Sequence, residues 1–329
     1  MRVAAQLGIE FHTFDFEEEY RKLVYEYMIS EYKAGRTPNP DVLCNKYMKF
    51  DLFMREADKL DCEFVATGHY ARVVRDATAP ATLNENEGSR KRGEVHLLAG
   101  VDKNKDQSYF LCQLTQSQLK RVLFPIGELE KSAVREIARQ HDLVVADKKD
   151  SQGICFVGKV DMQDFLEARI QPHAGNIVTT AGGVIGQHRG FEFYTIGQRG
   201  GLGVGGGTPY YVVERRPETN EVVVAVGDED SALYRSDLTA TNLTETIEGN
   251  FAKYQGQKIL ARIRYRQPLA VCEVRRTSYV ESEELSIPDE RRTTNALAVT
   301  FSTPQRAVAP GQFIAFYVGV ELIGSGIIA

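Results

Sequence analysis

Two short segments place a cysteine where its thiol could do chemistry. In residues 38–45 (PNPDVLCN), two prolines stiffen a loop that brings Asp41 and Cys44 close to the expected start of a helix. A helix N-terminus stabilises negative charge and lowers the pKa of a thiol, and a nearby carboxylate could move a proton. In residues 148–158 (KKDSQGICFVG), two lysines precede Cys155 and could stabilise its thiolate. Both segments also fit a buried, unreactive thiol.

Three further segments carry side chains that suit a ligand. Gly68 and His69 directly follow an expected strand, and ligands of open parallel sheets lie beyond the carboxyl ends of strands. Residues 102–110 (DKNKDQSYF) form a lysine-bearing loop ahead of a helix, which suits phosphate and sugar groups. Residues 262–267 (RIRYRQ) alternate, which predicts three arginines on one face of a strand and Tyr265 on the other. Such a face can follow a nucleic-acid backbone. The alternatives are a structural histidine, a solvated helix cap and the charged outer face of a barrel.

The first half of the chain alternates strand and helix patterns. Apolar side chains recur every three or four residues over 16–32, which predicts an amphipathic helix, and a second helix covers 45–60. Strands are expected at 9–14 and 63–67, and further helices at 106–114, 116–123 and 130–141. Strands that alternate with helices indicate a parallel sheet covered on both faces.

The pattern changes after about residue 158. A short helix fits 161–170, and short alternating segments then follow at 191–196, 210–214, 221–226, 258–265, 269–275, 297–301 and 312–317. Short strands at this spacing, separated by glycine, proline and asparagine turns, indicate small β-domains and barrels in particular. We therefore expect three domains, at residues 1–157, 158–232 and 233–329.

Composition narrows the class of protein. The 329 residues carry 40 Lys and Arg against 45 Asp and Glu, a net charge of −5. No apolar run approaches the roughly 20 residues of a membrane helix. The five cysteines include no CxxC pair, and nothing has the paired ligand spacing of a zinc site. We expect a protein of the reducing cytoplasm, with no disulfide scaffold, no bound metal and no membrane contact. The mild acidity leaves room for a local basic patch.

Eight segments together resemble the tRNA-specific 2-thiouridylase family, in that family's order and nearly to the last residue. They are GRTPNPDVLCN (35–45), ATGHYAR (66–72), DKNKDQSYFL (102–111), FPIGELEK (124–131), KKDSQGICFVG (148–158), TIGQRGGLGVGGG (195–207), RYRQP (264–268) and APGQFIAFY (309–317). The resemblance implies a fold of α/β plus β class. It would comprise a partial adenine-nucleotide-hydrolase-like parallel sheet domain (PP-loop ATPase, Rossmann-like), a small central domain and a C-terminal β-barrel.

The resemblance also implies an activity and a role for each matched residue. The family uses Mg-bound ATP to adenylate the C2 oxygen of the wobble uridine in tRNA, and then replaces that oxygen with sulfur. Cys155 would receive sulfur as a persulfide from a sulfur-donor or relay protein. Cys44 would release that sulfur and form a transient disulfide with Cys155. Asp41 would act as the acid/base, with Asn39 and Pro40 beside it on the target base. Gly68 maps to a nucleotide-binding position, and the positions that contact or help place tRNA are His69, Lys105, Asp106, Gln107, Arg264, Tyr265 and Gln312.

One feature of the family is absent from this sequence. The family begins with a PP-loop of the type SGGxDSS, which surrounds the ATP phosphates, and no such segment occurs here. The resemblance therefore implies a chain that is short at its N-terminus by at least a strand–loop–helix unit of roughly 30 residues. We expect its phosphate site to be missing, so two alternatives stay open beside thiolation. One is a non-catalytic protein that binds tRNA or carries sulfur, and the other is a thiol oxidoreductase that uses Cys44 and Cys155.

Overall fold

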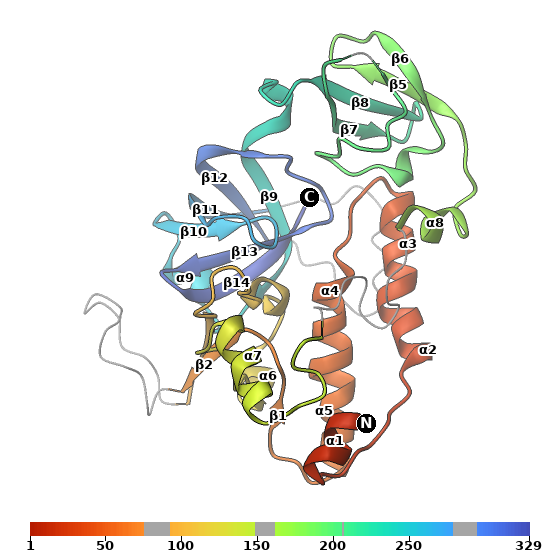
Figure 1. Cartoon of the computed structure of the whole chain (residues 1–329). Helices are drawn as coiled ribbons and strands as arrows, with labels where there is room; N and C mark the ends of the chain where they lie inside the picture. The colour runs from red at the N-terminus through yellow and green to blue at the C-terminus, as the bar shows by residue number, and fades with distance from the viewer. Residues whose placement is uncertain (76–92, 149–161, 206, 279–294) are drawn as a thin grey trace.

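The computed structural model describes residues 1–75, 93–148, 162–205, 207–278 and 295–329. Figure 1 shows three parts: helices and short strands from the first half of the chain at the lower right, a barrel at the left, and a smaller sheet at the top. No helix within the described ranges is long and apolar enough to span a membrane. No group of three or more histidine, cysteine or acidic residues in those same ranges is placed to hold a metal ion.

Two long helical rods make up most of the first part. The first joins α2 (Glu17–Tyr20), η1 (Arg21–Tyr25) and α3 (Glu26–Lys33), and the second joins α4 (Pro40–Leu43), η2 (Cys44–Leu52) and α5 (Phe53–Lys59). Both helices were expected, the first from its apolar periodicity, and the second begins at Pro40 and not at the expected residue 45. Their buried stripes meet through side chains such as Val24 and Met48, which are almost completely buried in one core. Gly35 follows the first rod with a φ of +70°, a value that glycine adopts without strain.

The parallel sheet of the described residues has two short strands, β1 (Val65–Ala66) and β4 (Val122–Leu123). Around it lie α1 (Arg2–Leu7), η4 (Ser108–Leu111), α6 (Gln116–Leu119) and α7 (Lys131–Gln140). The expected strand at 9–14 is wrong, because this segment has no regular structure and no strand partner among the described residues. The helix expected over 116–123 ends at Leu119, because the next residues pair with β1.

Six strands close into an antiparallel barrel. Neighbours in order are β13 (Phe313–Val318), β10 (Lys258–Arg262), β11 (Ala270–Ser278), β12 (Asn295–Arg306), β9 (Tyr234–Glu245) and β14 (Glu321–Ile328), and β13 pairs again with β14. Phe316 and Phe251, which lies in α9 (Asn250–Lys253), pack edge to face in the interior with ring centroids 5.4 Å apart. Burying one such ring contributes about 1.5–3 kcal/mol to folding, so the barrel has its own apolar core.

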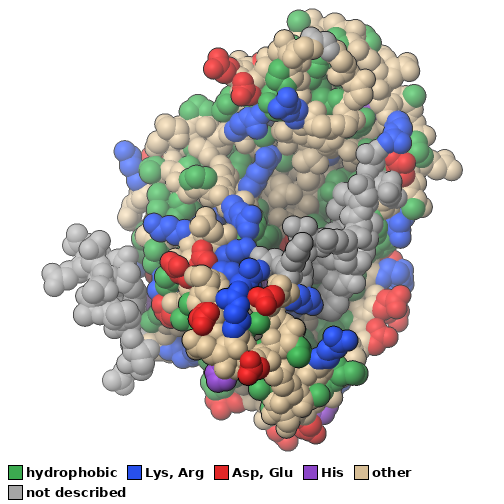
Figure 2. Space-filling view, viewed as in Figure 1, with side chains coloured by type: hydrophobic (Ala, Val, Ile, Leu, Met, Phe, Trp, Pro, Cys, Tyr) green, Lys and Arg blue, Asp and Glu red, His purple; other side chains and the backbone are tan. Residues whose placement is uncertain are grey.

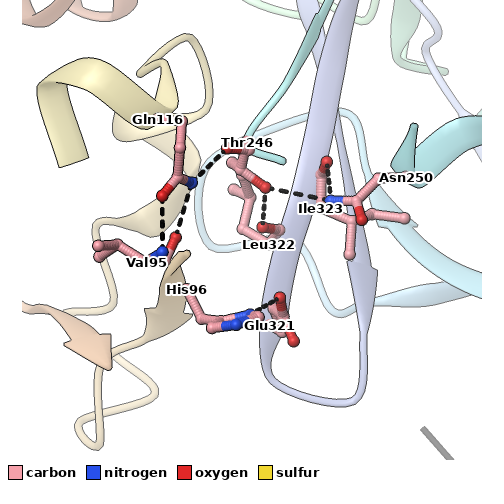
Figure 3. A network of polar contacts seen from close by, with 8 residues as sticks. All are labelled: Val95, His96, Gln116, Thr246, Asn250, Glu321, Leu322 and Ile323. Carbon is pink, nitrogen blue, oxygen red and sulfur yellow. Dashed lines mark hydrogen bonds and ion pairs between the residues drawn. The ribbon is translucent and has the colours of Figure 1, made fainter. Parts of the chain in front are cut away.

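A hairpin from the first half of the chain extends this barrel sheet. β3 (Val95–Ala99) pairs with β2 (Ala71–Arg75) on one side and with the first two residues of β14 on the other. Figure 3 shows the polar contacts that hold this junction. Gln116 bonds both backbone groups of Val95 and the carbonyl of Thr246, and His96 Nδ1 lies 2.5 Å from Glu321 Oε1 in a buried pair. The first domain and the barrel therefore share a continuous sheet.

The central part is a four-stranded sheet with the order β6 (Val184–His188), β5 (Gly175–Thr179), β8 (Glu221–Val226) and β7 (Tyr210–Arg216). It follows α8 (Met162–Glu167), and η6 (Ser231–Leu233) leads from it into the barrel. The strand expected at 191–196 is wrong: Gly190 has a φ of +149° and a single turn, η5 (Phe191–Phe193), follows it. The predicted architecture is nonetheless confirmed, with a parallel-sheet domain, a small central domain and a C-terminal barrel.

Candidate functional site

A short loop leads into the helix that carries Asp41 and Cys44. Asn39 caps this helix, because its Oδ1 accepts a hydrogen bond of 3.3 Å from the backbone N–H of Val42. Pro40 occupies the first helical position, where a missing N–H costs nothing. Asp41 is partly exposed in the first turn, whereas Cys44 is fully buried. The helix start expected from the sequence is therefore confirmed, with the carboxylate at the surface and the thiol inside.

The barrel holds this loop through one side chain. Gln312 Nε2 donates to the backbone carbonyls of Thr37 (3.1 Å) and Pro38 (3.2 Å), and its Oε1 accepts from Asn39 Nδ2 at 3.2 Å. All of these contacts join segments more than 270 residues apart in the sequence. The structure thus brings together two motifs that sequence analysis singled out separately, at 35–45 and at 309–317.

The backbone of the barrel also approaches the loop closely. The N–H of Thr37 donates to the carbonyl of Pro310 at 2.8 Å. Gly311 has a φ of +89°, and a Cβ at that position would lie 2.9 Å from the Thr37 nitrogen and 3.0 Å from Arg36 Cβ. Only glycine fits a position with both this φ and this contact.

The central domain contacts the same loop from a third side. The Arg215 guanidinium donates to Thr37 Oγ1 and to the backbone carbonyl of Tyr194, both at 2.9 Å. A Cβ on Gly35 would lie 3.0 Å from Pro217 Cγ, so the start of the loop also lies against this domain. The segment that precedes Asp41 is therefore held by all three parts of the molecule.

The cysteines occupy different environments. Cys155 lies outside the described residues, so its predicted pairing with Cys44 stays a prediction. Burial raises the pKa of the Cys112 thiol and of the Cys272 thiol to about 12 in each case, which makes both unreactive near neutral pH. Cys62 is exposed, at the end of the second helical rod.

Gly68 and His69 follow β1, as expected. Gly68 is exposed at the carboxyl end of the strand. His69 is 7% exposed, its Nδ1 lies 2.7 Å from Thr67 Oγ1, and its ring packs against the rings of Phe50 and Phe124. Burial lowers the pKa of His69 to about 3, so the imidazole is neutral at physiological pH. His69 therefore belongs to the packed interior next to the exposed Gly68.

The lysine-bearing loop divides into an exposed part and a buried part. Asp106 Oδ2 lies 3.0 Å from Arg262 Nη2 in a buried ion pair, and its Oδ1 accepts from two backbone N–H groups at 3.0 Å. Gln107 Oε1 accepts from the backbone N–H of Tyr70 at 3.0 Å. Lys105, which precedes both, is partly exposed. Asp106 and Gln107 thus hold the shape of the loop that presents Lys105.

The predicted single face of arginines at 262–267 is wrong. β10 ends at Arg262, which is buried, and the chain then turns, with Arg266 at a φ of +63°. Arg264 Nη2 donates to the carbonyl of Ala307 at 2.6 Å and to a second carbonyl in the central domain. Arg266 Nε donates to the carbonyl of Asn104 at 3.2 Å. The turn breaks the alternation, so the three arginines reach three different places.

Some of these side chains still form a connected basic surface. Burial lowers the pKa of Arg264, and the charge of Arg306 acts on it in the same direction. Arg266 bonds the carbonyl of Asn104, which stands between Lys103 and Lys105, so this arginine connects the turn to the lysine-bearing loop. We call this series the basic row, and it consists of Arg306, Arg264, Arg266, Lys103 and Lys105. Figure 2 shows Lys and Arg side chains gathered in a band down the middle of one face of the molecule.

An aromatic pair lies within the basic row. The ring of Tyr265 packs on that of Phe110 with centroids 4.5 Å apart, and the guanidinium of Arg266 lies over the Tyr265 ring at 5.2 Å. Tyr265 is partly exposed. Cationic groups interleaved with aromatic rings suit contact with a nucleic-acid strand.

Comparison with known families agrees with this arrangement. The tRNA methyl transferase HUP domain matches residues 1–159, the tRNA methyl transferase PRC-barrel domain matches 163–226, and the aminomethyltransferase beta-barrel domain matches 244–328. The tRNA-specific 2-thiouridylase MnmA of Bacillus licheniformis is 43% identical over 329 residues, which are 100% of this chain and 80% of that protein. The chain belongs to the tRNA-specific 2-thiouridylase family. Another 2-thiouridylase of this family, from Streptococcus mutans, is 42% identical over 333 residues, which cover 99% of this chain and 80% of the Streptococcus protein.

Sequence reasoning missed several residues that build the site of this 2-thiouridylase family member. Arg215, Thr37 and Gly311 hold the loop that leads to Asp41, and Arg262, which was expected on an exposed arginine face, holds Asp106 from inside. The proline–glycine dipeptide at 310–311 is a turn signal that could have drawn attention to Gly311. Nothing in the sequence marks Arg215 or Arg262 as buried, because each is one of several arginines in a charged segment.

Proposed function

We propose that this chain is a sulfurtransferase that replaces the C2 oxygen of the wobble uridine of tRNA with sulfur in an ATP-dependent reaction. The observation that carries the proposal is the convergence of Gln312, Gly311 and Arg215 on the loop that contains Asn39. Two other parts of the chain, the barrel and the central domain, hold that loop, and it leads directly into the turn with Asp41. A loop held in this way can present a small group of atoms to a base with little rearrangement.

The proposed roles at the target base follow the helix start. Asn39 and Pro40 contact the base, and Asp41 moves the proton. Asp41 lies in the first helical turn, where the backbone dipole stabilises the ionised carboxylate, and its partial exposure leaves it open to a substrate. Cys44 lies three positions further on along the same helix and is fully buried, so this proposal requires that binding of the substrate opens a path to its thiol.

The sulfur step uses two cysteines and no oxidant. Cys155 carries a persulfide, received from a donor protein. The Cys44 thiolate attacks the Cys155 sulfur, the S–S bond to the terminal sulfur breaks, and hydrosulfide leaves to replace the activated oxygen at C2. A disulfide between Cys44 and Cys155 remains, and a dithiol reductant returns both to thiols. This chemistry explains why one cysteine alone would not complete a turnover.

The residues present do not fit the phosphates of ATP. The exposed backbone of Gly68 at the end of β1 can support a base or ribose. Phosphates need backbone N–H groups from a tight loop at a helix N-terminus. The described residues place no glycine- or serine-rich turn between β1 or β4 and a helix, and the sequence has no PP-loop. We therefore derive no activation step from the residues of this chain.

The basic row provides the proposed contact with tRNA. Lys105 and Arg264 are partly exposed on either side of the exposed Arg266, so phosphates can meet several cations in succession. Tyr265 offers a ring for a base. In this proposal Asp106, Gln107 and His69 act from inside, by holding the surface that tRNA contacts.

A second candidate function needs only Cys155 and the basic row. The chain would then bind tRNA and carry sulfur on Cys155, while another protein activates the uridine. Both candidates require tRNA binding that weakens steeply with salt, whereas a thiol oxidoreductase requires none.

One experiment separates these functions. The chain is loaded with labelled sulfur by a persulfide donor, mixed with tRNA, ATP and Mg²⁺, and the label in tRNA is measured. Transfer by the unaltered chain that is lost in Cys155→Ser, Cys44→Ser and Asp41→Asn, and kept in the control Cys62→Ser, supports thiolation. Loading and tRNA binding without transfer favour the sulfur carrier. Loading without tRNA binding contradicts both candidates and leaves the oxidoreductase.

A further inference from the structure

Arg215 lies in β7 of the central domain, and its side chain is 8% exposed. Its two terminal nitrogens donate to Thr37 Oγ1 and to the carbonyl of Tyr194, both at 2.9 Å. Its Nε is buried and has no hydrogen-bond partner within the described part of the chain. A guanidinium is thus removed from water with only two neutral acceptors in contact with it.

Burying the Arg215 guanidinium in this way lowers the stability of the fold. Removal from water lowers the pKa of Arg215 to about 10, although the group stays protonated at neutral pH. Nearby Tyr32 and Glu192 act in the opposite direction, but the carboxylate of Glu192 bonds His173 at 2.9 Å and makes no hydrogen bond to the guanidinium. A buried charge without a paired carboxylate destabilises a fold. We therefore expect Arg215 to contribute something other than stability.

The contact with Thr37 indicates what this contribution is. Each polar group of Thr37 is bonded to a different residue: its N–H to Pro310, its carbonyl to Gln312 and its hydroxyl to Arg215. The first two contacts come from the barrel and the third from the central domain. Thr37 is two residues from Asn39, so its orientation sets that of the helix start.

We propose that Arg215 is a positioning residue: it fixes Thr37, and through Thr37 the loop that presents Asn39 and Asp41 to the target base. This inference rests on the proposed function for its catalytic consequence. Arg215 touches no substrate in this account. Its contribution is to make the central domain part of the catalytic arrangement, because it gives Thr37 its hydrogen bond from that domain, beside the apolar contact of Gly35 with Pro217.

The first test measures the loop without any need for activity. Arg215→Met keeps the length of the side chain and removes both donors, and Thr37→Val removes the acceptor from the other side. Arg216→Met is the matched control, because the neighbouring guanidinium pairs with Glu214 and Glu221 at the surface. Hydrogen exchange of the peptide over residues 36–43 should be at least about tenfold faster in the first two variants and unchanged in the control.

The second test measures sulfur transfer to tRNA. We expect kcat to fall by about tenfold or more in Arg215→Met and in Thr37→Val, with KM for tRNA within about twofold of the unaltered chain. The double variant should lose no more than either single variant, and Arg215→Lys should restore part of the loss.

The two tests fail in different ways. Unchanged exchange over 36–43, or faster exchange spread evenly over the central sheet, would overturn the positioning role. Independent, multiplicative losses in the double variant would overturn the link through Thr37. If the unaltered chain transfers no sulfur, the proposed function fails, and the exchange comparison alone then decides whether Arg215 holds the loop.

Discussion

Replacing Gly311 by alanine tests the close contact between the barrel and the loop before the candidate active helix. Two separate penalties are expected. The first is backbone strain, because φ is +89° and a residue with a Cβ disfavours this region by about 1–2 kcal/mol. The second is steric, because the new Cβ would lie 2.9 Å from the Thr37 nitrogen and 3.1 Å from its carbonyl carbon. Backbone atoms cannot turn away, so the loop itself must shift, at a further cost of about 1–3 kcal/mol.

Gly319→Ala separates these penalties. Gly319 also has a positive φ, of +58°, but a Cβ there would meet no atom within 4 Å. Its replacement should destabilise the protein by the strain alone. In urea unfolding, Gly311→Ala should lower the free energy of unfolding by about 1–3 kcal/mol more than Gly319→Ala does. Gly311→Ala should also reduce sulfur transfer, whereas Gly319→Ala should not. Equal losses of stability in the two variants would refute the claim that the barrel and the loop are in tight contact.

Three other properties can be measured on the same protein. Arg262→Met leaves Asp106 buried without its partner and should lower the free energy of unfolding in urea by about 3–5 kcal/mol. Arg275→Met breaks an exposed pair and should lower it by under about 1 kcal/mol. Similar losses in the two variants would show that burial of the ion pair does not determine its contribution. The pKa of His69 is about 3 when folded and 6.5 when unfolded, so its contribution to stability is present above pH 6.5 and is lost as the pH falls toward 3. Unfolding curves at pH 6.5 and 4.5 should therefore differ more for the unaltered chain than for His69→Gln, by roughly 1 kcal/mol per pH unit, and parallel behaviour would contradict a buried neutral ring. Alkylation at pH 8, resolved by peptide, should modify Cys62 quickly and spare Cys112, whose pKa is about 12; rapid reaction of Cys112 would contradict its burial.

Much of the fold could be predicted because local patterns and long-range packing agree. The helical rod at 17–33 follows the apolar spacing of three and four residues, although both rods contain a π-helical stretch (η1 and η2), and the barrel strands follow an alternating pattern. Predictions of secondary structure failed where the pairing of a segment with another strand decides whether it forms a strand. Residues 9–14 have the composition of a strand but lack a partner among the described residues, and Val122–Leu123 leave a helical pattern to pair with β1.

The site could be predicted only as separate pieces. Residue types and spacing identify Asp41 and Cys44 as candidates, whereas Asn39 and Gln312 are candidates only through the resemblance to the 2-thiouridylase family. The contacts that join these pieces link residues far apart in the sequence: Arg215 and Thr37 are separated by 178 positions, and Gln312 and Asn39 by 273. No local pattern encodes such a contact, because it depends on how three domains pack. The same reason explains the error at 262–267, where a turn that bonds to the central domain replaces a continued strand.

The strand pairing between β3 and β14 affects how the chain folds as it is made. His96 and Glu321 are 225 residues apart, and a ribosome adds roughly 5–20 residues per second. The hairpin of β2 and β3 therefore emerges roughly 10–45 s before the strand that pairs with it. During that interval Leu97, which is fully buried in the finished protein, lacks its partner Leu322. The sheet of the first domain is therefore completed only after β14 has left the exit tunnel, and until then the edge of β3 that pairs with it stays unpaired.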